Sequence, residues 1–251
     1  MSFPIMGIAP FSALYAAPTT TAKSHIGQLA MDPMGGLWRY FKAGAAITNP
    51  LLGCGNYQQP SDASITAAAV GALEVDVTSL TVYDSVAKDQ FADGTIIIGA
   101  AAANRRWYHI RGNTYNAADD TTLTLHHPVR YAIAGDEWAT LTANPWYDVR
   151  HLTAGANLMS VVCMPLQPVA SGSYAWGKTR GPIFGTVTST VPGAAAKDRA
   201  VVFNGADGAL RMADEAWGLS TPNSEQYAGW LIPRTGSTYA AGDQCIWLQI
   251  E

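Results

Sequence analysis

Two adjacent histidines, His126 and His127, are the first candidates for metal binding in this chain. A zinc site needs several ligands that converge on one ion. Successive side chains of a strand point to opposite faces, so a histidine pair on a strand cannot easily chelate one ion. No Asp, Glu or Cys stands at ligand spacing from the pair. We therefore expect no metal site, and we interpret His109 and His151 as strand or interface histidines with hydrogen-bonding partners.

The carboxylates and serines form no recognisable catalytic motif. Carboxylates occur as adjacent pairs in expected turns, namely Asp119-Asp120, Asp136-Glu137 and Asp214-Glu215. The two acids of a glycosidase are brought together by the fold, so sequence spacing neither supports nor excludes such a pair. A nucleophilic serine would need a G-x-S-x-G elbow, whereas Ser171 lies in Ala-Ser-Gly. We expect a protein that is not an enzyme and uses no cofactor; a cell-wall or glycan hydrolase stays open as an alternative.

The three cysteines, Cys54, Cys163 and Cys245, are far apart and form no C-x-x-C pair. Their spacing therefore suggests neither a zinc site nor a thioredoxin-type site. We expect free, buried thiols in a protein made in a reducing cytoplasm.

The composition favours a β-rich protein that covers part of its surface with neighbours. Charged residues make up 14% of the 251 residues, whereas hydrophobic residues make up 48%. The formal net charge is −4 and basic runs are absent from the sequence, which argues against nucleic-acid binding. No apolar run approaches the roughly 18 residues of a membrane span, so we expect no membrane association. Residues 1–17 lack the basic start of a signal peptide and are expected to stay in the mature protein.

The hydrophobic pattern predicts strands throughout the chain. Apolar and polar residues alternate over residues 73–77 and 121–125, and Ile246, Leu248 and Ile250 share one face of a last strand. Further strands are expected over residues 37–43, 95–99, 106–112, 138–142, 158–164, 183–187, 200–203 and 227–232. Turn signals separate these segments, and no segment of 12 residues has a convincing helical period. The predicted fold is all-β, a sandwich or barrel of many short antiparallel strands, with helix confined to one or two short turns.

The predicted organisation is an N-terminal arm followed by a β-rich region. Residues 1–30 contain Pro4, Pro10 and Pro18 and no clean period, which indicates an extended arm. We expect contacts with another subunit to order this arm. Residues 31–251 are expected to form one β-rich domain or two packed β subdomains, because no linker is long enough to force a division.

Two predicted strands carry large aromatic residues beside basic ones, the composition of many protein interfaces. The first covers residues 37–43, and the second begins at Tyr174 and is expected to end in a turn at Gly181-Pro182. The candidate interface residues on these strands are Trp38, Arg39, Tyr40, Lys42, Tyr174, Trp176, Lys178 and Arg180. The alternative is that the rings fill the core. Trp138, Trp146 and Trp217 lie near turns and are candidate sugar-stacking platforms, with core or interface packing again the alternative.

Several segments, taken in order, resemble a widespread group of tailed-phage virion proteins. Residues 174–182, YAWGKTRGP, are similar to that group's Y-x-W-x-Q-T-K-G-P segment, and Asn144-Pro145-Trp146 is similar to its N-P-Y/W turn. The other similar segments are residues 36–44, 68–72, 75–77, 89–94 and 123–129. The N-terminal arm departs from the group's pattern.

The resemblance implies a structural protein of the virion, made in the cytoplasm of the host bacterium. It further implies a decoration or cement protein of the capsid, with the major capsid protein or other virion proteins as partners. A homotrimer is then the expected state, because symmetric shells present three-fold sites. The alternative is a receptor- or glycan-binding appendage of the virion. The resemblance supplies no catalytic residues.

Overall fold

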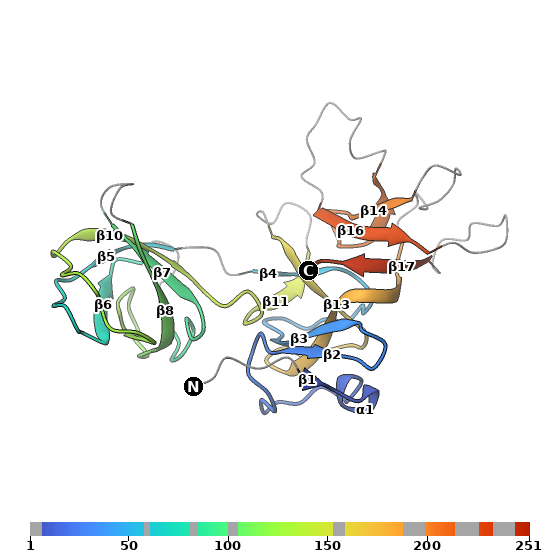
Figure 1. Ribbon diagram of the computed structural model, residues 1–251, viewed down its shortest axis with the longest axis horizontal. Coiled ribbons are helices and arrows are strands. Elements are labelled where there is room, and N and C mark those ends of the chain that lie inside the picture. Colours follow the sequence, from blue (N-terminus) through green and yellow to red (C-terminus); the bar gives the residue numbers. More distant parts are fainter. Residues whose placement is uncertain are drawn as a thin grey trace. The chain divides into compact units, whose positions relative to one another are not determined.

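A computed structural model of the chain describes residues 7–57, 61–80, 85–99, 105–152, 159–187, 199–213, 226–232 and 244–251. The regular secondary structure of the described residues is almost entirely strand, with one four-residue helix, α1 (Phe11–Leu14) (Figure 1). The prediction of an all-β fold is therefore confirmed. None of the described residues belongs to a helix that is long and apolar enough to cross a membrane.

The chain divides into two compact units. Gln58–Pro145 form one, which we call the barrel unit, and Met1–Tyr57 with Trp146–Glu251 form the other, which we call the sheet unit. The barrel unit is thus inserted between two stretches of the sheet unit. The sequence indicated no division at these positions, because neither boundary carries a long polar linker.

The barrel unit is a closed six-stranded barrel with antiparallel pairs in the order β10-β5-β6-β9-β8-β7. Its strands are β5 (Ser61–Ile65), β6 (Glu74–Thr78), β7 (Thr95–Ile98), β8 (Arg106–Asn113), β9 (Thr121–Leu125) and β10 (Glu137–Thr142). Closure leaves the six strands without a free sheet edge.

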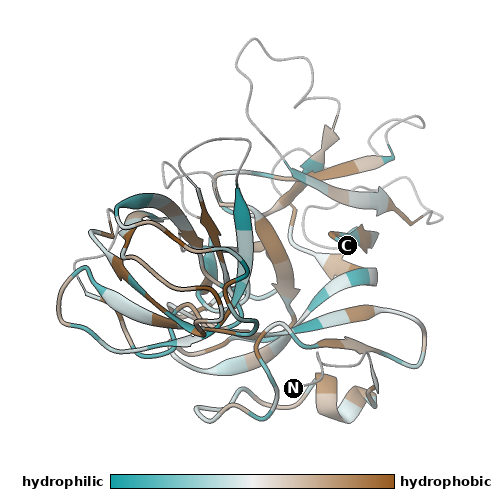
Figure 2. Cartoon of the chain, turned by 60° about the vertical axis from the view of Figure 1, so that its left-hand side comes forward, coloured by the Kyte–Doolittle hydropathy of each residue, from teal (hydrophilic) through white to brown (hydrophobic). Residues whose placement is uncertain are grey.

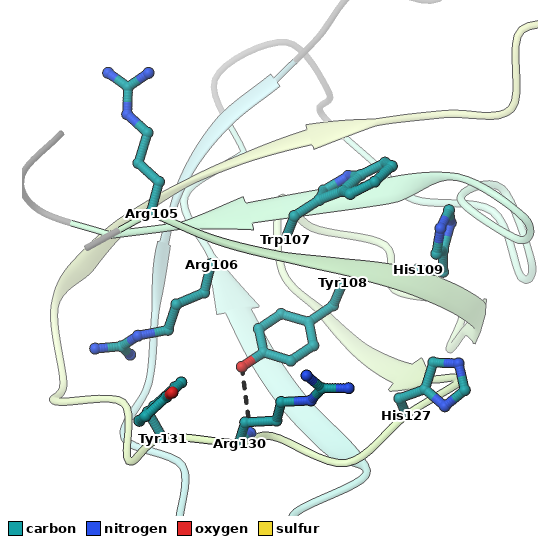
Figure 3. Close-up of a pocket in the computed structure, with 8 residues that line it drawn as sticks. All are labelled: Arg105, Arg106, Trp107, Tyr108, His109, His127, Arg130 and Tyr131. Carbon is teal, nitrogen blue, oxygen red and sulfur yellow. Dashed lines mark hydrogen bonds between the residues drawn. The ribbon is translucent and has the colours of Figure 1, made fainter. Parts of the chain in front are cut away.

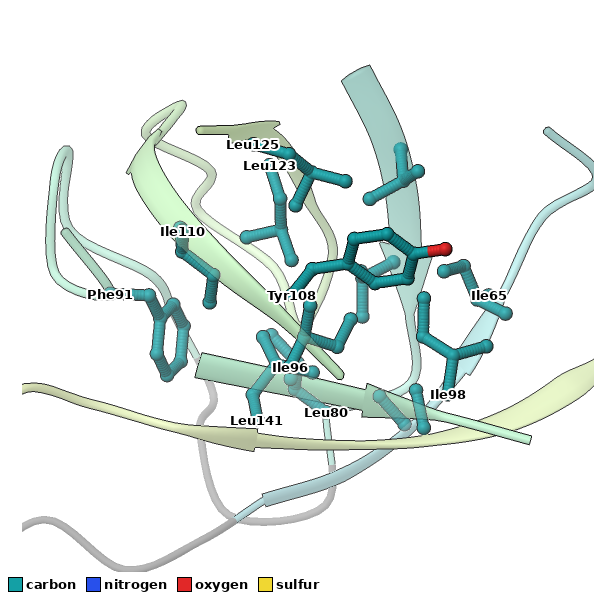
Figure 4. Packing of buried hydrophobic residues seen from close by; sticks show 14 of the residues in the cluster. Ile65, Leu80, Phe91, Ile96, Ile98, Tyr108, Ile110, Leu123, Leu125 and Leu141 are labelled. Atoms are coloured by element: carbon teal, nitrogen blue, oxygen red, sulfur yellow. The ribbon is translucent and has the colours of Figure 1, made fainter. Parts of the chain in front are cut away.

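Apolar side chains alternate with polar ones along the barrel strands, and the apolar side chains fill the interior of the barrel (Figure 4). In β6, Val75 and Val77 are buried while Glu74 and Asp76 are exposed. The strand expected over residues 95–99 forms as β7 and is fully buried on one face only. Ile96 and Ile98 point into the core, but Ile97 is partly exposed, because a barrel wall has an outer face. Figure 2 shows the resulting hydrophobic segments on the strands.

The described strands of the sheet unit form one eleven-stranded sheet. Its main path is β1-β2-β3-β13-β17-β16-β14-β15, while β4 pairs β11 and β12, and β12 also pairs β13. The bounds are β1 (Gly7–Ile8), β2 (Leu29–Met31), β3 (Leu37–Lys42), β4 (Cys54–Asn56), β11 (Val149–His151), β12 (Val161–Pro165), β13 (Tyr174–Gly185), β14 (Ala200–Phe203), β15 (Leu210–Met212), β16 (Gln226–Leu231) and β17 (Gln244–Gln249).

The twelve-residue strand β13 is the centre of this sheet and corrects one prediction. Gly181-Pro182 is not a turn, because the strand continues through it and changes partner from β3 to β17 at Arg180. Gly181 has a positive φ of 105° at the change. The carbonyl of Pro182 accepts a hydrogen bond from Lys178 Nζ at 2.8 Å.

The described part of the N-terminal segment is folded against the sheet unit. β1 pairs with β2 in parallel, and α1 places Leu14 in a small buried cluster with Ala30 and Trp38. The ring of Tyr15 packs edge-on against Trp38 with centroids 5.4 Å apart. Over residues 7–30, these elements make contacts within the chain, where the sequence predicted an extended arm ordered by another subunit. Short elements fit between the prolines because each is only two to four residues long.

Candidate functional site

The predicted interface residues of β3 and β13 come together, but the largest of them lie inside the sheet unit. Trp38 pairs with Lys178 and Tyr40 pairs with Trp176 across the two strands. Trp38, Tyr40 and Lys178 are buried, and Trp176 is half-buried. Within the chain, these rings therefore match the alternative interpretation, a core layer.

A buried polar network explains how a lysine is accommodated in that layer. Asp32 Oδ2 accepts a hydrogen bond from Trp38 Nε1 at 3.0 Å, and Oδ1 accepts one from the backbone N–H of Gly36 at 2.8 Å. Lys178 Nζ lies 3.7 Å from Asp32 Oδ2 and 5.2 Å from the centre of the Trp38 ring. Burial alone would raise the pKa of Asp32, but these hydrogen bonds and the lysine charge lower it. Burial lowers the pKa of Lys178, and Asp32 opposes that effect.

The remaining predicted residues on these strands also have partners inside the chain, with one exception. Arg39 pairs with Glu251 at 2.8 Å, and its guanidinium lies 4.6 Å from the Trp146 ring. Lys42 lies 4.6 Å from the ring of Tyr147, and Tyr174 stacks on Tyr40 with centroids 6.1 Å apart. Arg180 is exposed. Because Arg39 packs on its ring, Trp146 is already a partner of an arginine and does not offer a free platform for stacking on a sugar.

A different set of aromatic residues in the same sheet is exposed. Pro182, Trp247, Trp230 and Ala200 are paired in one row across β13, β17, β16 and β14, and Phe184 and Cys245 are paired in the neighbouring row. We call this surface the aromatic face. Phe184 is 59% exposed and Trp230 is 40% exposed, and Trp230 stacks on Trp247 with centroids 5.6 Å apart. Directly paired residues share one side of a sheet, so the rings form a continuous patch.

Sequence patterns indicated the buried side of these strands but missed the aromatic face. Ile246 and Leu248 were expected to share a face, and both are buried. Their neighbour Trp247 must then point to the other side of β17. The missing information was whether a second layer covers that side, and no local pattern carries it.

The barrel unit holds a pocket of about 290 Å³ lined by cationic and aromatic side chains (Figure 3). The lining residues are Arg105, Arg106, Trp107, Tyr108, His109, His127, Arg130 and Tyr131. They come from the start of β8 and from the segment that follows β9. Two hydrogen bonds hold that segment beside β8, from His126 N–H to the His109 carbonyl at 3.0 Å and from Arg130 N–H to the Tyr108 hydroxyl at 3.3 Å.

The cations of the pocket differ in how they are held. Arg106 donates to the Ala132 carbonyl at 3.2 Å and lies 3.7 Å from a carboxylate oxygen of Glu137. The side chains of Arg105 and Arg130 are exposed and have no hydrogen-bond or ion-pair partner among the described residues. Unpaired guanidinium groups beside exposed rings can bind an anionic group on a flat ligand.

The histidine pair separates as expected. His126 lies 3.7 Å from a carboxylate oxygen of Asp93, whereas His127 lines the pocket. Within the described ranges, no three His, Cys, Asp or Glu side chains group closely enough to hold a metal ion.

Folding also brings Cys54 and His151 together, with Sγ 3.8 Å from Nδ1. This pair could suggest a nucleophilic dyad, which sequence spacing did not indicate. Burial raises the pKa of Cys54 to about 12, and burial lowers the pKa of His151. Both groups are therefore neutral at pH 7, and the pair lacks the activated thiolate that catalysis requires. Cys163 is also a buried free thiol, and Cys245 is half-buried.

The remaining candidate residues either lie on the wall of the barrel or fall outside the residues that the structure describes. Trp138 is exposed on β10 and does not line the pocket. Trp217 and the pair Asp214-Glu215 lie outside the described residues. Residues 106–112 were expected to form a strand, and His109 was interpreted as a strand or interface histidine, but Arg105 to Tyr108 were not predicted as site residues. Two arginines followed directly by aromatic residues were the available signal.

In comparisons with protein-family models, curated proteins and solved structures, nothing matches this chain.

Proposed function

We propose that this protein is a non-enzymatic structural component of a tailed-phage particle, a decoration or cement protein that stabilises the capsid shell. The observation that carries the proposal is the aromatic face, because its exposed rings offer an apolar contact surface for a neighbouring subunit, with the exposed Arg180 in the next row. The sequence resemblance to virion proteins supports the same assignment. The proposed partners are the major capsid protein or other virion proteins, and the proposed location is the virion.

The physical argument starts from the cost of exposing large rings to water. Contiguous apolar patches on soluble proteins commonly mark protein interaction sites. The paired rows of the aromatic face hold Phe184, Trp230 and Trp247 and contain no charged residue. Aromatic residues without charges are typical of the buried centre of an interface. We further propose a homotrimer, because a shell with three-fold sites is matched by a three-fold partner.

The test is the assembly state of a chain with an altered aromatic face. The double variant Phe184→Ser and Trp230→Ser should keep the fold, because both side chains are exposed. Light scattering should give the unaltered chain a mass near three times 26.6 kDa and show it binding to particles that lack it. The double variant should be a monomer and should bind such particles much more weakly.

The matched control is Tyr115→Ser, which removes a ring of the barrel unit that is 66% exposed. It should leave the mass and the particle binding unchanged. A monodisperse monomer that never binds the particles would contradict both the trimer and the cement role.

The second candidate is a receptor- or glycan-binding appendage of the same particle. The observation that favours it is the pocket of the barrel unit, with its exposed rings and two arginines, Arg105 and Arg130, whose side chains have no partner among the described residues. Copy number separates the two candidates: a cement protein should be present in hundreds of copies per particle, and an appendage in a few to a few dozen.

A further inference from the structure

The positive charge of the barrel unit is concentrated at its pocket. The unit contains five Lys and Arg residues and ten Asp and Glu residues, a formal net charge of −5. Three of those five cations, Arg105, Arg106 and Arg130, line the pocket. Such a local concentration in an acidic unit favours an anionic group at one place rather than a long polyanion along the surface.

The exposed rings of the pocket provide a second type of contact. Trp107 is 62% exposed and Tyr131 is 66% exposed. The ring of Trp107 lies beside that of His109 with centroids 4.8 Å apart, which restricts its orientation. Tyr108 points to the opposite side of β8, into the barrel core, and its hydroxyl accepts the hydrogen bond from the backbone N–H of Arg130. The rings can therefore contact the apolar face of a ligand while the guanidinium groups contact its charge.

We propose that this pocket binds an acidic saccharide, with Arg130 contacting its anionic group and Trp107 stacking on a sugar ring. Its volume, about 290 Å³, suits a short stretch of such a polymer. The inference rests on the second candidate function and does not require the cement role. A nucleic acid is disfavoured because the rest of the barrel unit would repel its backbone.

The experiment is isothermal titration calorimetry on the purified full chain in low salt. The probes are a galacturonate hexamer, which carries carboxylates, glucose 6-phosphate, which carries a phosphate, neutral maltohexaose and oligothymidylate. Binding of either acidic sugar with no heat from maltohexaose is expected, and comparison of the two acids identifies the preferred anion.

Three single variants connect the binding to the pocket. Arg130→Ala should weaken binding of the acidic sugar about ten- to a hundredfold, because it removes charge-assisted hydrogen bonds. Trp107→Ala should weaken it about two- to tenfold through the lost stacking. The matched control is Arg111→Ala. Arg111 is an exposed arginine on β8, the strand that carries Trp107, and it does not line the pocket. This control should change the affinity by about twofold or less, because the long-range attraction of Arg111 is screened.

Three results would overturn the proposal: no binding of either acidic sugar, an Arg111→Ala loss equal to that of Arg130→Ala, or tighter binding of oligothymidylate than of the sugars. Circular dichroism and the thermal midpoint of each variant verify that the barrel is intact. Since no particle is present in the titration, a negative result here leaves the particle-binding experiment unaffected, and the reverse also holds.

Discussion

The two halves of β13 place similar residues in opposite environments. The first half, paired with β3, carries Trp176 and Lys178 against Trp38 in a buried layer. The second half, paired with β17, carries Phe184 on an exposed surface. The comparison teaches that an aromatic residue beside a basic one does not by itself indicate an interface. The elements packed on each side of the strand decide which rings face water.

The sheet unit and the pocket of the barrel unit differ in the same way. In the sheet unit, Arg39 pairs with Glu251 and lies over the ring of Trp146, so its charge is already used within the chain. In the pocket, Arg105 and Arg130 have no such partner among the described residues, and their neighbouring rings are exposed. Cationic and aromatic groups without partners are the better candidates for binding, because no internal contact must be broken first.

The largest effect expected from this comparison is on folding stability. Phe41 is fully buried on β3, whereas Phe184 is 59% exposed on β13. Phe41→Ala should lower the free energy of unfolding by about 3–5 kcal/mol, because it removes a core ring and leaves a cavity. Phe184→Ala should change it by about 0.5 kcal/mol or less. Urea denaturation measures both, and equal losses would contradict the assignment of the two faces.

A medium effect is expected at the buried carboxylate. Asp32→Asn should cost about 1–3 kcal/mol, because Lys178 and the donors around Asp32 lose a charged partner. The pKa of Asp32 lies below its ordinary value of 3.8 in the folded chain. Its contribution is therefore complete above that value and is lost as the pH falls through the lower folded pKa. Denaturation between neutral and acidic pH should show this loss in the unaltered chain and a flatter profile in Asp32→Asn.

The control for this experiment is Asp119→Asn, which alters an exposed carboxylate. It should change stability by about 0.5 kcal/mol or less and keep the acid-dependent loss of the unaltered chain. A profile as flat as that of Asp32→Asn would assign the acid sensitivity to general charge instead of to the buried network.

The smallest expected effect is a difference in thiol reactivity between the half-buried cysteine and the two buried ones. Cys245 is half-buried on the aromatic face, while Cys54 and Cys163 are buried. Burial raises the pKa of all three thiols, with Lys178 partly opposing it at Cys245. A thiol reagent should therefore label one cysteine of the native chain, slowly at neutral pH and faster as the pH rises. Cys245→Ser should abolish this labelling; retained labelling would place Cys54 or Cys163 within reach of solvent.

By itself the sequence determined the all-β class and most of the strands. Alternation at Val75 and Val77 and at Ile246 and Leu248 identified which side of each strand is buried. These features are local, because the two-residue period of a strand is set by its own backbone. The free state of the three cysteines also matched what their spacing predicted.

Only the tertiary structure decided where the chain divides, how β13 continues through Gly181-Pro182 and which aromatic rings face water. Each of these depends on a partner that is distant in sequence: β17 receives the second half of β13, and the segment after β9 completes the pocket beside β8. A single strand specifies two faces but not what lies against either of them. The burial of Trp38 and the exposure of Trp107 are therefore properties of the assembled fold, because burial is set by the elements packed on a side chain and not by its own neighbours in sequence.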